Sequence, residues 1–165
     1  MKCRIKPGRS AKMKNLIGQV RISLAFMNKK NIYRILDANL NRAREGVRVT
    51  EEVARLYFDD AKLSSKFKRV RHELTKVGKK SFDQEKLLSF RDSEKDVGAD
   101  SMGSLEKRRA DLSSIVQANL RRSQEATRVL EEFGKLINPD SAKSFKKIRF
   151  RLYTLEQEIL GLLQA

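Results

Sequence analysis

Two asparagines and two arginines stand at matching positions in a repeated stretch of the chain. Asn39 and Arg42 return eighty residues later as Asn119 and Arg122. An arginine among apolar residues needs an anionic partner, and a buried amide needs hydrogen-bond partners. One explanation is structural: Arg42 pairs with Glu45, and Asn39 bonds a neighbouring helix. The other is that both copies line one cavity, in which the four side chains face an anionic ligand.

The repeat extends well beyond these four positions. Residues 38–56 and 118–136 share ten identities over nineteen positions, which chance does not easily produce. Neither copy contains proline, and apolar residues recur at helical spacing, so we predict a long helix over 33–57 and another over 114–137. The apolar positions of the first helix cover more than half of its circumference, so we expect it to lie at the centre of its domain.

A second helix is predicted after each copy. Asp59 and Asp60 offer turn and N-cap chemistry before the first, and Asn138 and Pro139 offer a cap and a first helical position before the second. Each repeat is therefore a helical hairpin. The repeats cover about residues 31–80 and 110–163. We predict an all-α bundle of two duplicated hairpins related by pseudo-two-fold symmetry, with a functional loop between them.

The connection between the hairpins, residues 87–112, interrupts the helical pattern with aspartate, serine and glycine. Loops of this length in a compact domain are usually functional or disordered, and the mixed charges here favour function. Asp92 and Asp96 are candidate magnesium ligands, because Mg²⁺ commonly takes one or two carboxylates beside substrate phosphates. Arg91 precedes them and could contact such a substrate.

Length and charge limit the classes of function. The 165 residues suit about one domain, and the net charge of +16 favours an anionic partner: nucleic acid, a membrane surface or a phosphorylated small molecule. The single cysteine, Cys3, and the single histidine, His72, exclude an internal disulfide and a Cys/His metal cluster. The common nucleotide-binding, metalloprotease and hydrolase motifs are absent from the sequence. A cytoplasmic protein is the default expectation.

Residues 1–26 carry seven lysines and arginines and no acidic residue. They could be a basic arm for nucleic acid, an organellar transit peptide, or an extension upstream of a true start at Met27. We favour the last, and so predict a basic extension over 1–26, outside the native chain, and a single helical domain over 27–165. The apolar run in this segment is broken by Arg21 and is too short to span a bilayer, so no membrane partner is expected.

Several separated segments resemble the monofunctional hydroxymethylpyrimidine phosphate kinases of thiamin biosynthesis. In chain order these are RILDANLNRAREGVRVTEEVAR, RHEL, LLSFRDSEKDVG and RRADLSSIVQANLRRSQEATRVLEEFGK, followed by IRFRLYTLE. The resemblance extends from Tyr33 to Glu156. This family also occurs fused in front of thiamine phosphate synthase. Ser93 and Lys95 depart from its pattern, which has more apolar and smaller residues there.

The resemblance implies an ATP-dependent phosphomethylpyrimidine kinase. ATP would phosphorylate the monophosphate of 4-amino-5-hydroxymethyl-2-methylpyrimidine to the diphosphate, with Mg²⁺ bridging the nucleotide phosphates. Both ATP and the phosphorylated pyrimidine are polyanions that suit duplicated arginines. Residue roles are assigned from spacing. The predicted catalytic residues are Arg42, Arg122 and Asp92; the predicted binding residues are Asn39, Glu45, Arg91, Asn119 and Glu125; the predicted metal ligands are Asp92 and Asp96.

The alternative is a small basic helical protein that binds nucleic acid or regulates without catalysis. Its predicted helices interleave acids and bases at i and i+4, as at Arg48 and Glu52, a pattern typical of a solvated face. We therefore disfavour nucleic acid as the partner. The sequence leaves homodimer formation open.

Overall fold

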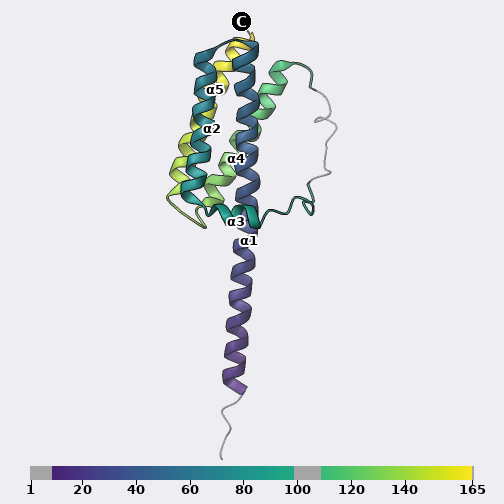
Figure 1. Cartoon of the computed structure of the whole chain (residues 1–165), viewed down its shortest axis with the longest axis vertical. Helices are drawn as coiled ribbons and strands as arrows, with labels where there is room; N and C mark the ends of the chain where they lie inside the picture. The colour runs from purple at the N-terminus through teal and green to yellow at the C-terminus, as the bar shows by residue number, and fades with distance from the viewer. Residues whose placement is uncertain (1–8, 99–108, 165) are drawn as a thin grey trace, which may run out of the picture.

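All regular secondary structure that the structure describes is helical, as predicted. The computed structural model describes the backbone of residues 9–98 and 109–164 and the side chains of residues 29–98 and 109–164. The elements are α1 (Arg9–Glu52), a π-helical turn η1 (Val53–Tyr57), α2 (Ala61–Ser81), α3 (Gln84–Ser89), α4 (Leu112–Gly134) and α5 (Ser141–Gln164) (Figure 1).

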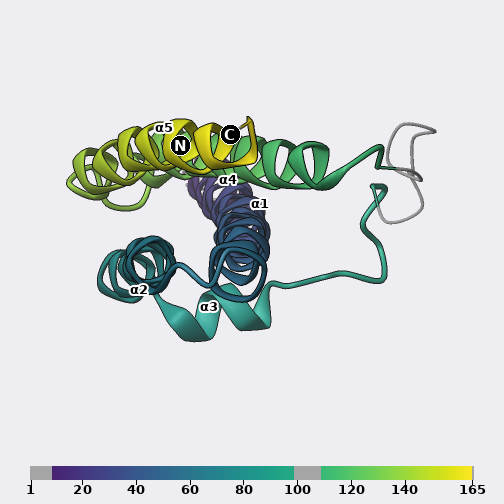
Figure 2. The same ribbon diagram turned by 90° about the horizontal axis from the view of Figure 1, so that it is seen from above.

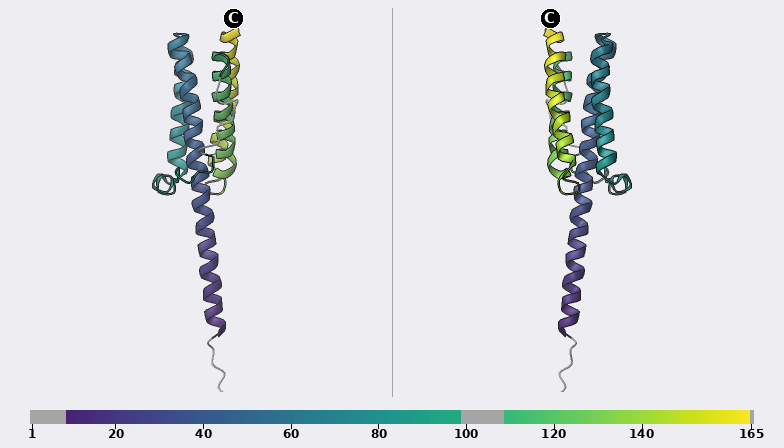
Figure 3. Two further views of the ribbon diagram at one scale, coloured as in Figure 1. Left: turned by 90° about the vertical axis from the view of Figure 1, so that its right-hand side faces the viewer. Right: turned by 90° about the vertical axis from the view of Figure 1, so that its left-hand side faces the viewer.

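The four long helices form two layers. The α1–α2 hairpin lies on one side and the α4–α5 hairpin on the other (Figures 2 and 3). α1 packs mainly against α4 and α2, and α5 packs against α4 and α2. The two predicted hairpins are therefore both present, whereas the short α3 at the end of the first was not predicted.

The first helix is longer than predicted. α1 begins at Arg9 and continues without a break past Met27 (Figure 1), so the predicted domain boundary lies within a helix. The part of α1 before the bundle projects from it as a single helix. That residues 1–26 lie outside the native chain stays a prediction, and residues 1–8 are not in the described part.

The core explains why α1 and α4 are central. Large apolar side chains from all four long helices are completely buried, and each contributes about 1.5–3 kcal/mol relative to exposure. Examples are Leu36, Val47, Phe67, Leu74, Leu120, Leu130, Phe145 and Leu152. At the centre Ser123 of α4 donates a hydrogen bond of 3.2 Å to the carbonyl oxygen of Ala43 on α1. The two helices therefore approach closely.

The predicted turn at the end of η1 is confirmed. The side chain of Asp60 accepts hydrogen bonds from the amides of Lys62 and Leu63, both at 2.9 Å, and Asp59 before it has a positive φ of 51°. In the second hairpin Asn138 accepts from the amide of Asp140. Here α5 begins at Ser141, so the prediction that Pro139 is the first helical residue is wrong by two positions.

Each hairpin is tied together by a buried glutamate and a partly buried arginine. Arg71 donates two hydrogen bonds, of 2.7 and 3.1 Å, to the carboxylate of Glu51. In the second hairpin Arg149 donates twice to Glu131, at 2.8 and 3.2 Å. The sequence repeat is thus accompanied by a repeat of contacts, while the pseudo-two-fold relation remains a prediction.

Glu51 makes the first hairpin sensitive to acid. Burial raises the pKa of its carboxyl group, but the hydrogen bonds and charge of Arg71, with the charges of Arg48 and Lys68, outweigh burial and hold the net pKa below its usual range. A carboxyl whose pKa is lowered by folding stabilises the fold above its unfolded pKa, and that contribution is lost as pH falls through the folded value.

We expect Glu51→Gln to lower the free energy of unfolding by about 2 kcal/mol at neutral pH, because Arg71 loses its charged partner. Urea unfolding at neutral pH and below the folded pKa of Glu51 measures this, and the difference from the parent should shrink in acid. Glu94→Gln, at an exposed loop position, is the control. Equal effects of both substitutions would show that the pair with Arg71 contributes nothing specific.

Candidate functional site

A cavity of about 520 Å³ opens between α1 and α4, and we name it the inter-helix cavity. Its lining comes from both copies of the repeat. The lining residues are Asn39, Arg42, Glu45 and Gly46 of α1, Gly98 of the loop after α3, and Asn119, Arg122, Glu125, Ala126 and Val129 of α4. The four residues that were singled out by the repeat therefore meet at one cavity, which is the arrangement the second explanation required.

The two asparagines have matching hydrogen bonds. The side-chain amide of Asn39 donates to the carbonyl oxygen of Ile35 at 2.8 Å, and that of Asn119 donates to Ile115 at 2.9 Å. Each asparagine thus bonds its own helix and not, as the structural explanation supposed, a neighbouring one. Among the described residues, neither side-chain oxygen accepts a hydrogen bond. Both oxygens remain able to accept one from a ligand.

The charged residues of the cavity are exposed. Arg42, Glu45, Arg122 and Glu125 all have exposed side chains, so the expectation that Arg42 is buried with the core is wrong. In the described part of the chain Arg42 has neither an ion pair nor a hydrogen bond, and the same holds for Glu45 and Glu125. A guanidinium without a protein partner can bind an anion without first breaking an ion pair.

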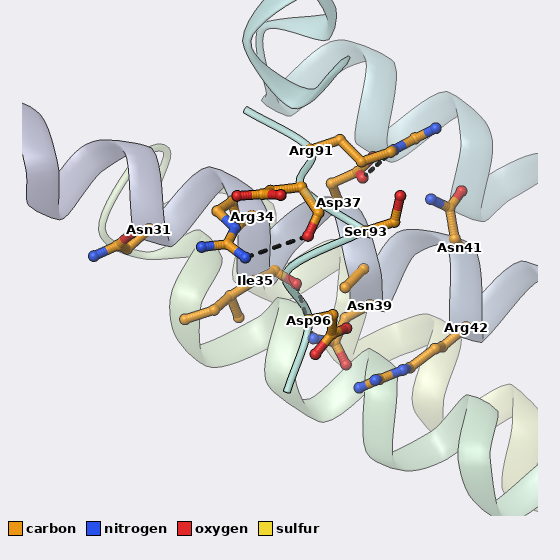
Figure 4. A pocket seen from close by; sticks show the side chains of 12 residues that line it. Asn31, Arg34, Ile35, Asp37, Asn39, Asn41, Arg42, Arg91, Ser93 and Asp96 are labelled. Carbon is orange, nitrogen blue, oxygen red and sulfur yellow. Dashed lines mark hydrogen bonds and ion pairs between the residues drawn. The ribbon is translucent and has the colours of Figure 1, made fainter. Parts of the chain in front are cut away.

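A second hollow, of about 460 Å³, shares Asn39 and Arg42 with this cavity, and we name it the loop hollow (Figure 4). The chain after α3 forms its wall by folding against α1. It is lined by Asn31, Arg34, Ile35, Asp37, Ala38, Asn39, Asn41, Arg42, Arg91, Asp92, Ser93 and Asp96. Because Arg42 borders both spaces, it lies between the inter-helix cavity and the loop.

Arg91 holds this loop to α1. Its guanidinium donates two hydrogen bonds, of 2.7 and 2.8 Å, to the carboxylate of Asp37 (Figure 4). These hydrogen bonds and the charge of Asp37 raise the pKa of Arg91 above its usual range. Arg34 adds a hydrogen bond of 3.4 Å to the backbone oxygen of Asp92. Arg91, predicted to bind substrate, is thus occupied by Asp37, a residue that sequence reasoning missed.

The predicted metal ligands both border the loop hollow. Asp92 and Asp96 lie in the loop, and one oxygen of Asp96 accepts a hydrogen bond of 3.0 Å from the amide of Gly98. Within the described ranges no group of three or more His, Cys, Asp or Glu side chains could hold a metal ion. One or two carboxylates are the usual protein ligands of magnesium when substrate phosphates supply further oxygen ligands.

The described helices include none that combines the length and the apolar run needed to cross a bilayer. The basic surface residues are partly neutralised. Arg48 pairs with Glu51 and Glu52, and Arg128 pairs with Glu131 and Glu132. This pairing is what the alternation of acids and bases predicted.

The ThiD2 family model matches residues 34–158. Over 130 residues the chain is 44% identical to the thiamine-phosphate synthase of Nostoc punctiforme and 43% identical to that of Synechocystis. It is 39% identical over 130 residues to the thiamine-phosphate synthase of Rhodopirellula baltica. These alignments cover 79% of this chain but 36%, 36% and 34% of the relatives. The chain thus spans about a third of their length. No solved structure matches it significantly.

The comparisons confirm a family of thiamin biosynthesis and correct the predicted activity. The relatives are named thiamine-phosphate synthases, and this is a different enzyme from a phosphomethylpyrimidine kinase. The prediction of an ATP-dependent pyrimidine kinase is therefore contradicted, and ATP as a partner loses its support.

Proposed function

Because this chain belongs to the ThiD2 family, we propose that it binds a phosphorylated aminopyrimidine of thiamin biosynthesis and serves the formation of thiamine phosphate. The observation that supports this proposal is the inter-helix cavity, where Arg42 and Arg122 meet Asn39 and Asn119. The relatives carry the name thiamine-phosphate synthase, but this chain corresponds to about a third of each. Its proposed part is to bind and orient the pyrimidine.

The polar groups of the cavity suit such a ligand. Arg42 offers a planar guanidinium, which binds the oxygens of a phosphate in a bidentate manner. The side-chain oxygens of Asn39 and Asn119 can accept hydrogen bonds from an exocyclic amino group. Glu45 and Glu125 add carboxylate acceptors on either side. Cations for the phosphate and acceptors for the amine thus occur in one cavity.

The cavity also offers an apolar surface for the ring. Val129 of α4 lines it beside the buried Ala126, and Gly46 of α1 adds no side chain. A flat pyrimidine could therefore lie against α4 while its amino group reaches the asparagines. Holding the ring and phosphate in one orientation lowers the entropic cost of a later bond-forming step.

Magnesium is proposed as a bridge between the phosphate and the loop hollow. Asp92 and Asp96 would supply carboxylate oxygens, and the ligand phosphate would supply others. We expect Asp96→Asn to raise the magnesium concentration for half-maximal ligand binding by about tenfold, because one anionic ligand is lost. Magnesium titrations at fixed pyrimidine phosphate measure this, with exposed Glu94→Asn in the same loop as control. An unchanged midpoint for Asp96→Asn and Asp92→Asn would remove the metal from the proposal.

Calorimetric titration of the full chain tests the proposal. The probe is 4-amino-5-hydroxymethyl-2-methylpyrimidine phosphate, and the comparison ligand is the same pyrimidine without its phosphate. We expect the phosphate to improve affinity by at least about tenfold, equal to about 1.4 kcal/mol. Equal affinities, or no binding by a folded chain, would contradict the proposed function.

A further inference from the structure

A second basic surface lies between α1 and α2, away from the inter-helix cavity and the loop hollow. A groove of about 700 Å³ is lined there by Arg44, Arg71, His72, Thr75, Lys76, Lys79 and Lys80. Its lining contains no acidic residue, and apart from His72 it contains no aromatic ring. We name this surface the basic groove.

Most cations of the basic groove are not neutralised by the protein. Arg71 is bound to Glu51, but Arg44, Lys76, Lys79 and Lys80 make no ion pair or side-chain hydrogen bond in the described part of the chain. Like charges three or four residues apart on a helix repel each other and cost stability. Helix stability therefore does not account for the four uncompensated cations around this groove.

The second hairpin shows that the scaffold does not need this charge. It repeats the glutamate–arginine pair of the first, as Glu131 and Arg149. Yet the positions that match the other basic residues of the groove carry no positive charge. Arg44, His72, Lys76, Lys79 and Lys80 correspond to Gln124, Phe150, Thr154, Gln157 and Glu158. The charge of the basic groove is thus a property of one copy only, added to a hairpin that folds without it.

The spacing of the basic side chains indicates the size of the ligand. Lys76 and Lys80 lie one helical turn apart, about 6 Å along α2, and His72, one turn before Lys76, extends this stripe of hydrogen-bond donors to about 12 Å. Arg44 faces this stripe from α1. A single phosphate can contact only part of such a stripe, whereas linked phosphates can contact several of its cations together. We propose that the basic groove is an anion-binding site, separate from the inter-helix cavity, that takes a diphosphate or longer polyphosphate group.

Nucleic acid fits the groove less well. Single strands are usually bound by stacking bases on aromatic side chains beside a basic track, and the groove offers no such platform. Toward η1 the uncompensated cations stop, because Arg48 and Arg55 are paired with Glu52. The surface is therefore suited to a short anion and not to an extended backbone.

Titration calorimetry with inorganic pyrophosphate tests the proposal, with inorganic phosphate as the reference ligand and the full chain as the sample. We expect pyrophosphate to bind at least about tenfold more tightly than phosphate. The double variant Lys76→Gln/Lys80→Gln should weaken pyrophosphate binding by about tenfold, because two phosphate contacts are lost. Arg44→Gln, which copies the second hairpin, should weaken it by about fivefold.

The matched control is Lys143→Gln/Lys147→Gln, which removes the same charge from exposed positions of α5. It should change binding by less than about twofold. The groove variants should lose the same factor in pyrophosphate affinity in the Arg42→Ala background as in the parent, so that this proposal and the proposed function can fail separately. Thermal melts establish that each variant is folded.

Four results would overturn the inference. The first is equal binding of pyrophosphate and phosphate. The second is an equal loss of binding in the α5 control, which would indicate a response to net charge alone. The third is a loss in Arg42→Ala and not in the groove variants, which would assign pyrophosphate to the inter-helix cavity. An oligonucleotide that displaces pyrophosphate from the groove at lower concentration would favour nucleic acid instead.

Discussion

Gly46→Ala is expected to lower the free energy of unfolding by about 3 kcal/mol, because the new methyl group would force α1 and α4 apart. A β-carbon at this position would lie 2.3 Å from Oγ of Ser123 and 2.4 Å from the carbonyl oxygen of Asn119. The serine could rotate, but the carbonyl oxygen belongs to the α4 backbone. Relief of the contact therefore requires the helices to move.

Gly161→Ala is the matched control for this prediction. Position 161 is also inside a helix, but an added β-carbon there meets nothing within 4 Å. Alanine should stabilise α5 by up to about 1 kcal/mol, the usual difference in helix propensity. Urea unfolding of both variants gives the comparison. If Gly46→Ala is as stable as Gly161→Ala, the close approach of α1 and α4 is not a constraint on the fold.

The same contact links stability to the site. Gly46 and Asn119 both line the inter-helix cavity, so any separation of the helices also displaces the Asn119 side chain from Asn39. In the second copy the position of Gly46 is occupied by Ala126, which is buried in the core. The repeat therefore does not make the two helices equivalent: only α1 needs glycine for the approach.

The helical hairpins could be predicted because their signals are local and repeated. Apolar periodicity predicted the long helices, and the N-cap residue Asp60 predicted the start of α2. The meeting of Asn39 with Asn119 could also be predicted, because each points with the core side chains of its own helix. The same helical periodicity predicted the direction of the Arg42 side chain, but it did not predict how far that side chain is exposed. Whether a side chain on the apolar arc is covered depends on the neighbouring helix.

The loop shows where sequence reasoning failed. Arg91 and Asp37 are separated by 54 positions, and the sequence offers many other opposite charges as partners. The one sequence signal for Asp37 was that it is an acidic residue among the apolar residues of α1. The predicted activity failed for a different reason. It came from a family resemblance and from no feature of the residues, and the names of the relatives contradict it.

Arg42→Ala is expected to weaken binding of the pyrimidine phosphate by about 100-fold, or about 2–3 kcal/mol, the usual contribution of a charged hydrogen-bonding group. The side chain is exposed and unpaired within the described residues, so its removal breaks no ion pair of the fold. Its loss should therefore appear in ligand affinity and leave the melting temperature within a few degrees. Calorimetric titration and thermal melts measure the two effects.

Two further variants establish that the effect belongs to the site. Arg42→Lys should recover only part of the affinity, because an ammonium group provides a point charge and no planar fork for two phosphate oxygens. Arg121→Ala removes an exposed arginine of α4 that does not line the inter-helix cavity, and it should change affinity by less than about twofold. Equal losses in Arg42→Ala and Arg121→Ala would mean that the ligand responds to the overall positive charge, whereas a loss confined to Arg42 places the phosphate between α1, α4 and the loop.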